Sequence, residues 1–147
     1  MAPFVSLVHG VDSLKLLKEI NKQALKNNRI INCLLQMHIA EEETKFGMNE
    51  AELNGLLASD EFAQLQNIKV TGLMGMATFT DNREQIKKEF SHLNSIFERI
   101  KQHPVTSNFT PKTLSMGMSG DYQLAIECGS TMIRVGSSIF GHRNYQP

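Results

Sequence analysis

The chain alternates short apolar runs with longer segments of helical periodicity, and this alternation constrains its fold more than any other feature. Apolar runs occupy residues 4–8, 30–39, 70–77, 114–118 and 132–135. No two of these runs are joined by the short turn that is typical of a β-hairpin. The order predicts about five βα units in a parallel sheet with right-handed crossovers.

The segments between these runs carry the signals of helices. Asp12 or Ser13 can cap the first helix, and Asn49 opens the second. The clearest helix follows Asp81 or Asn82. Its apolar residues recur at steps of four and three, which places them on one face: Ile86, Phe90, Leu93, Phe97 and Ile100. A short helix over residues 121–128 precedes the fifth run.

Two closures satisfy this order of elements, an open doubly wound sheet or part of a (β/α) TIM-type barrel, and periodicity does not choose between them. Gly72 and Gly75 lie inside the third run, where glycine is costly unless another part of the backbone comes close. The 147 residues are 41% hydrophobic and 20% charged, which is typical of a globular protein. No composition shift marks a linker, so residues 1–147 are predicted to form a single domain.

Composition also argues against several classes of partner. The formal net charge is +0, so no basic surface for nucleic acid or for an anionic membrane is expected. No apolar run approaches the roughly 20 residues that span a bilayer, and the first residues lack the basic start of a signal peptide. The expected location is the cytoplasm. Cys33 and Cys128 have no metal-ligand neighbours at useful spacing and are expected to be reduced thiols, and no metal site is predicted.

Two turns that follow consecutive predicted strands carry the first functional signal. Ligands of parallel βα proteins bind at the carboxyl ends of the strands. Residues 117–121 read Gly-Met-Ser-Gly-Asp and residues 136–138 read Gly-Ser-Ser. Backbone N–H groups in such turns, with the hydroxyls of Ser119 and Ser137, could form one phosphate cup. The alternative, in which the glycines only form turns and the serines only cap helices, stays open.

Arg134 is the single residue that most strongly indicates a functional or structural role, because it lies within an apolar run that is expected to be a buried strand. A buried guanidinium needs partners. One interpretation is a structural ion pair, for which Asp121 is a candidate, and the other is a contact to a ligand. Residues 41–43, three glutamates, are expected to form a solvated loop, and His38 is expected to be a polar rim residue. The methionines Met74 and Met118 are expected to pack in the sheet, with a possible contact to a flat ring.

The C-terminal third resembles the signature of the pyridoxal-phosphate homeostasis proteins, whose barrel is similar to the N-terminal domain of alanine racemase. The resemblance rests on Ser115-Met116-Gly117-Met118-Ser119, Arg134-Val135-Gly136 and Ile139-Phe140-Gly141-x-Arg143. Further segments resemble earlier strands of that family: residues 9–12, residues 34–39 with Glu42, Lys45 and Gly47, and residues 72–76.

This resemblance implies a (β/α)8 barrel that carries pyridoxal 5'-phosphate (PLP) without being an enzyme. It implies that Ser119 and the backbone of Gly136 and Ser137 hold the phosphate, and that Arg134 faces the pyridine nitrogen. An arginine there keeps that nitrogen unprotonated and weakens the ring as an electron sink. At His38 the family more often has asparagine, so the resemblance assigns that side chain no role.

The chain corresponds to the C-terminal part of that barrel, beginning near the family's fourth strand, and it lacks the segment with the lysine that bonds the cofactor. PLP binding is therefore expected to be non-covalent at best, and weak or lost. Five βα units cannot close an eight-stranded barrel, so the chain is expected to self-associate through exposed sheet edges or to rearrange as an open sheet.

Three functions are compatible with these residues. The first is non-catalytic PLP binding in PLP homeostasis. The second is a racemase-like PLP enzyme, which needs a lysine and an opposing acid or base, and Tyr122 and Tyr145 are the only tyrosines available. The third is an inert half-barrel that retains only a phosphate or sulfate site. The residues favour the first function over the second and leave the first and third open.

Overall fold

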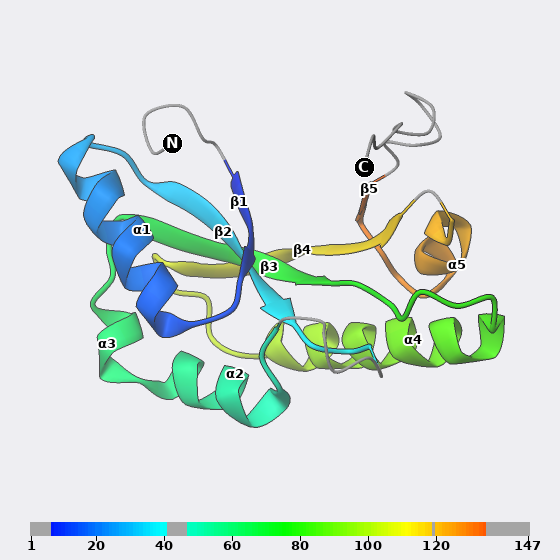
Figure 1. Ribbon diagram of the computed structural model, residues 1–147. Coiled ribbons are helices and arrows are strands. Elements are labelled where there is room, and N and C mark those ends of the chain that lie inside the picture. Colours follow the sequence, from blue (N-terminus) through cyan, green and yellow to red (C-terminus); the bar gives the residue numbers. More distant parts are fainter. Residues whose placement is uncertain (1–6, 41–46, 119, 135–147) are drawn as a thin grey trace, which may run out of the picture.

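The computed structural model describes residues 7–40, 47–118 and 120–134, and these form one five-stranded sheet with helices (Figure 1). The strands lie side by side in the order of the sequence, and each pairs in parallel with the next. A doubly wound sheet reverses its strand order at a switch point, whereas a barrel does not. The sheet is therefore a half-barrel, and the prediction of a partial (β/α) barrel is confirmed. The strands are Leu7–Val11 (β1), Ile31–Met37 (β2), Ile68–Gly75 (β3), Phe109–Met118 (β4) and Met132–Arg134 (β5).

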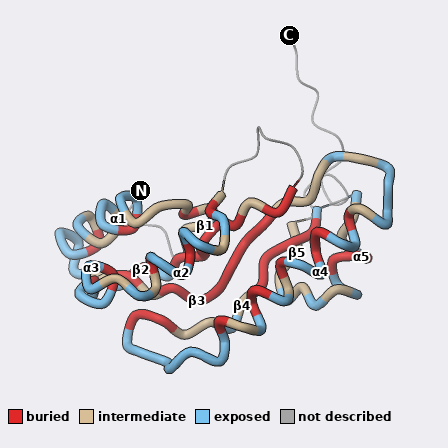
Figure 2. The backbone as a smooth tube through the Cα atoms, turned by 90° about the horizontal axis from the view of Figure 1, so that it is seen from below, coloured by how far each residue is buried: buried red, intermediate tan, exposed pale blue. Residues whose placement is uncertain are grey.

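The helices of the described residues cover one face of this sheet. A single apolar core takes side chains from all of them and from alternate positions of the strands, such as Leu35, Leu73 and Leu114. Figure 2 shows these buried segments along the centre of the molecule, with exposed helix surfaces around them. The helices are Leu14–Lys26 (α1), Glu50–Ala58 (α2), Asp60–Ala63 (α3), Arg83–Ile100 (α4) and Tyr122–Glu127 (α5).

Helix starts follow the capping signals of the sequence. Ser13, not Asp12, caps α1 by accepting from the Leu16 N–H, and Asn82, not Asp81, caps α4. Asn49 forms a capping box with Glu52, in which each side chain accepts from the backbone N–H of the other residue. Polar caps of this kind satisfy N–H groups that the first turn leaves unpaired.

Strand starts are where the sequence prediction was wrong. β4 begins at Phe109, not at residue 114, and β3 spans Ile68–Gly75, not residues 70–77. In β4 the segment 110–113 has partly exposed and exposed side chains, so it shows no apolar pattern although its backbone joins the sheet. β1 begins at Leu7 where the prediction placed residues 4–8, of which residues 4–6 lie outside the described residues.

The glycines of β3 mark close approaches, as the sequence predicts. A Cβ atom on Gly72 would lie 1.7 Å from the Thr113 carbonyl oxygen of β4. A Cβ atom on Gly75 would lie 2.7 Å from a methyl carbon of Leu93 in α4. Gly72 therefore allows β3 and β4 to meet, and Gly75 allows β3 to press against α4.

The sheet face opposite the helices is called the inner face below. Between the core positions of β2, β3 and β4 it presents Leu34, Gln36, Met74 and Ser115, all of them buried. No helix in the described part of the chain is long and apolar enough to cross a membrane.

Candidate functional site

Arg134, at the end of β5, is fixed by two neighbouring strands. Its Nη1 donates to the Ser115 hydroxyl of β4 at 2.7 Å, and its Nη2 donates to the Gly75 carbonyl of β3 at 3.3 Å. Met118, not Ser115, is the direct partner of Arg134 in the ladder, so the guanidinium reaches back along β4 over the inner face. These bonds supply the partners that a half-buried guanidinium requires.

The electrostatics of Arg134 reflect its burial. Loss of solvent lowers the pKa of the guanidinium from its ordinary value, and the negative charge of Asp121 opposes that shift. Among the described residues, the guanidinium donates hydrogen bonds to Ser115 and Gly75, and Asp121 acts on it through charge. Arg134 is thus not held by the ion pair with Asp121 that was one of the two predicted interpretations.

Asp121 instead shapes the turn between β4 and α5. Its Oδ1 accepts the Met118 N–H at 2.7 Å, and its own N–H donates to the Met118 carbonyl at 3.1 Å. Gly117 has a φ of +105°, which a side chain would strain, and its Cβ would lie 2.7 Å from Ala125. A hollow of about 180 Å³ lies beside this turn, lined by Arg83, Gly120, Asp121, Tyr122, Gln123 and Leu124.

His9 on β1 is a further polar group that the structure brings towards Arg134, and sequence analysis assigned it no role in the site. His9 is an exposed residue, but partial loss of solvent lowers the pKa of its imidazole, and the positive charge of Arg134 lowers it further. The two residues belong to opposite edges of the sheet. The charge of Arg134 thus acts on His9 from the opposite edge of the sheet, as the curvature of a half-barrel allows.

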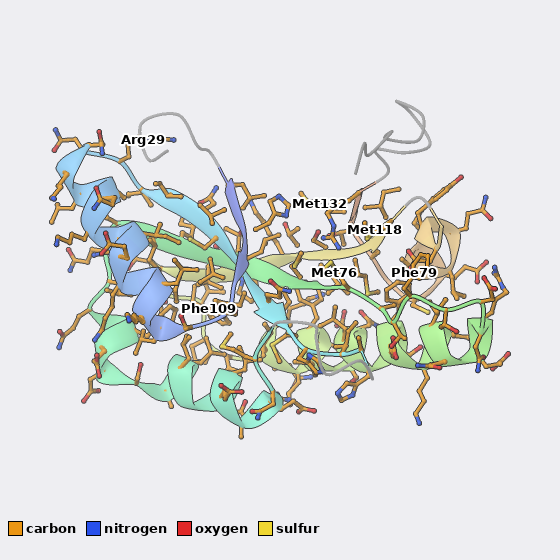
Figure 3. All side chains as sticks on the ribbon, viewed as in Figure 1. Arg29, Met76, Phe79, Phe109, Met118 and Met132 are labelled. Atoms are coloured by element: carbon orange, nitrogen blue, oxygen red, sulfur yellow. The ribbon has the colours of Figure 1, made fainter. Side chains whose placement is uncertain are left out.

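The two methionines predicted to touch a flat ring occupy different environments. Met74 is buried on the inner face of β3, and its ladder partner on β4 is Ser115, the residue that binds Arg134. Met118 is 48% exposed at the carboxyl end of β4 (Figure 3). Met74 therefore lies on the inner face beside Ser115, the residue that holds Arg134, whereas Met118 lies at the carboxyl end of its strand.

The predicted phosphate residues Ser119, Gly136 and Ser137 lie outside the described residues, and so do residues 41–43 and Lys45. Their roles remain predictions. Within the described ranges, no group of three or more His, Cys, Asp and Glu side chains could hold a metal ion.

Glu89 is a structural anchor that sequence analysis did not identify. Its buried carboxylate accepts from the Thr78 N–H and from the Thr78 hydroxyl, each at 2.6 Å, and from Gln85 at 3.2 Å. Thr78 belongs to the loop that follows β3, so Glu89 ties this loop to α4 at the carboxyl edge of the sheet. In sequence Glu89 lies three residues after Ile86 and four before Leu93, so it falls on the apolar face of the helix, and a charged residue there was a signal that sequence analysis did not use.

Comparison with known proteins places this geometry in a family. The model of the alanine racemase N-terminal domain matches residues 3–144. The pyridoxal phosphate homeostasis protein of Aquifex aeolicus is 36% identical over 141 residues, covering 96% of this chain and 60% of that protein. The corresponding protein of Haemophilus influenzae is 38% identical over 135 residues, covering 92% of this chain and 55% of that protein.

A solved structure agrees with these relatives. PipY of Synechococcus elongatus PCC7942, solved with PLP bound, superposes with a TM-score of 0.79 at 29% identity, covering 92% of this chain and 61% of the PipY chain. The chain thus spans a little over half the length of the relatives that it matches. Because the family model covers nearly the whole sequence and the strand order is that of a barrel, the chain belongs to the alanine racemase N-terminal domain family.

Proposed function

We propose that the inner face of the half-barrel binds PLP without catalysing a reaction on it, in the service of PLP homeostasis in the cytoplasm. The observation that carries this proposal is Arg134, a guanidinium fixed on the inner face at the carboxyl ends of the strands. The names of the relatives and the bound PLP of PipY support the same ligand.

The residues of the described part fit PLP by their chemistry. PLP has a flat aromatic ring, a ring nitrogen that accepts hydrogen bonds, and an anionic phosphate. Arg134 offers N–H donors and positive charge, and Met74 offers a polarisable apolar surface beside it. When bound, PLP supplies an electron-accepting ring. An arginine donor at the ring nitrogen leaves that nitrogen unprotonated, which suits a carrier better than a catalyst.

We assign the phosphate to Ser119, Gly136 and Ser137 on the strength of the sequence motif, and a ring contact at the rim to Met118. The described neighbours of Ser119 support the first assignment: Gly117 has a φ of +105°, and two hydrogen bonds join Asp121 to Met118. Two neighbouring loops of this type commonly hold phosphate in barrels of this class.

Self-association through the sheet edges is part of the proposal. In the described residues β1 pairs only with β2, and β5 pairs only with β4, so each presents one unpaired side of its backbone. Unpaired strand edges readily accept another strand. Light scattering coupled to size-exclusion chromatography tests this on the 147-residue chain: a dimer or larger species supports it, and a monomer at high micromolar concentration contradicts it.

An absorption titration with PLP tests the cofactor assignment. PLP, pyridoxal and inorganic phosphate are each added to the chain, and the PLP sample is then reduced with borohydride and weighed by intact mass analysis. Saturable binding of PLP, weaker binding of pyridoxal, and no single reduced adduct would support non-covalent binding. Equal competition by phosphate alone would indicate a simple anion site, and racemisation of added amino acids in the presence of PLP would indicate an enzyme.

A further inference from the structure

We infer that Ser115 is the positioning residue for Arg134: its hydroxyl holds the guanidinium so that the remaining N–H groups stay directed at a ligand on the inner face. The inference rests on the proposed function and deepens it. Nothing in the sequence motif distinguishes Ser115 from the phosphate residues that follow it.

The contact between these two side chains is built into the sheet. Ser115 is 0% exposed and lies on the inner face of β4, with Met74 of β3 as one ladder partner and Met132 of β5 as the other. The Arg134 Nη1 lies 2.7 Å from its hydroxyl oxygen, the distance of a strong charge-assisted hydrogen bond.

The two bonds leave part of the guanidinium available. A guanidinium has five N–H donors. Ser115 and the Gly75 carbonyl take one each, from different terminal nitrogens. In the described part of the chain, the Nε–H and one N–H of each terminal nitrogen therefore remain for a ligand, and their directions are set because the guanidinium is planar and rigid.

Burial makes the hydroxyl hard to replace. Ser115 has no exposed surface, so alanine at position 115 would leave the Nη1 proton without this fixed acceptor. Gly75 cannot hold the guanidinium alone, since its bond is longer at 3.3 Å and a single contact allows rotation about it. Gly75 itself is fixed by its tight packing against Leu93.

The test compares Ser115→Ala with Ser95→Ala in the full 147-residue chain. Ser95 is the matched control. Its hydroxyl also makes one hydrogen bond, to the His92 carbonyl at 2.6 Å, but it lies on the exposed side of α4. Two quantities are measured: the NMR signals of the Arg134 side chain in ligand-free protein, assigned by their loss in Arg134→Gln, and the PLP dissociation constant. Circular dichroism establishes that each variant is folded.

In the parent chain and in Ser95→Ala we expect slow rotation and slow hydrogen exchange of the Arg134 guanidinium. In Ser115→Ala we expect rapid rotation, and about tenfold weaker PLP binding, as for loss of a hydrogen bond to a charged group. Ser115→Thr retains a hydroxyl and should restore both properties if the variant folds. Unchanged Arg134 signals and PLP affinity in folded Ser115→Ala would overturn the inference alone. Absence of saturable PLP binding in the parent chain would instead overturn the proposed function, and with it the ligand role of Ser115.

Discussion

Arg134 on β5 lowers the pKa of His9 on β1, although these two strands form opposite edges of the sheet. Partial loss of solvent contributes the larger part of the shift, although His9 as a whole remains exposed, and the guanidinium charge adds to it. The curvature of a half-barrel is compatible with this interaction between residues of the two edge strands. When His9 is protonated, its positive charge and that of Arg134 repel each other.

Replacing Arg134 with glutamine should raise the pKa of His9, because the imidazolium no longer faces a fixed positive charge. The control is Arg99→Gln, which removes an arginine that pairs with Glu50 on the helix side of the molecule. NMR titration of the His9 ring protons measures the shift. Equal His9 pKa values in the two variants would show that Arg134 does not act on His9.

The lowered pKa of His9 also makes the stability of the fold depend on pH. The folded chain binds a proton at His9 less readily than the unfolded chain, so the free energy of unfolding should rise with pH just below the ordinary imidazole value of 6.5. His9→Gln should flatten the part of this dependence that His9 contributes. Urea unfolding of both chains between about pH 5 and 7 measures it, and identical slopes would contradict the assignment.

Glu89→Ala should destabilise the fold by about 2 kcal/mol, since it leaves the Thr78 N–H without its buried acceptor. Glu98→Ala is the control on the same helix: its carboxylate makes an exposed pair with Lys101 and should cost less than about 0.5 kcal/mol. Urea denaturation compares the two variants. A Glu89→Ala cost as small as that of the control would mean that the loop after β3 does not depend on this anchor.

Gly72→Ala and Gly55→Ala should act in opposite directions. The new Cβ at position 72 would overlap the Thr113 carbonyl and force β3 and β4 apart, at a cost of about 3 kcal/mol or more. At Gly55, inside α2, a Cβ meets no atom within 4 Å, so alanine should stabilise the helix by about 0.5–1 kcal/mol. Thermal unfolding measures the stability of the two variants. A Gly72→Ala variant as stable as the parent chain would refute the register of β3 against β4.

The two cysteines should differ sharply in reactivity. Burial raises the pKa of the Cys33 thiol to about 12, so almost no thiolate forms at neutral pH, whereas Cys128 is partly exposed. A colorimetric thiol reagent should modify one thiol quickly in the native chain and both in denaturant. Rapid modification of Cys33 in native protein, located by peptide mapping, would contradict the packing of β2.

The sequence predicted the order of elements well because a parallel βα repeat leaves a strong apolar pattern. It could not choose between a barrel and an open sheet, since that choice depends on which strands become neighbours and not on any single strand. The first residues of β4 escaped prediction because segment 110–113 joins the sheet through its backbone while its side chains remain partly or fully exposed.

In the candidate site, too, the sequence revealed a residue that stands out locally but not its partners from distant strands. Arg134 stood out because a charged residue inside an apolar strand needs partners. Its partners Ser115 and the Gly75 carbonyl come from two other strands, 19 and 59 positions away, and no local pattern specifies such contacts. Asp121 was a reasonable candidate for an ion pair, but its carboxylate accepts the Met118 N–H instead.

The most direct test of the account is the PLP dissociation constant of Arg134→Gln measured beside that of Arg99→Gln and the parent chain. The account predicts that Arg99→Gln binds PLP like the parent and that Arg134→Gln, folded by circular dichroism, binds at least about tenfold more weakly. Equal affinities in all three chains would show that PLP, if it binds, does not use the inner face at Arg134, and would contradict the proposed site.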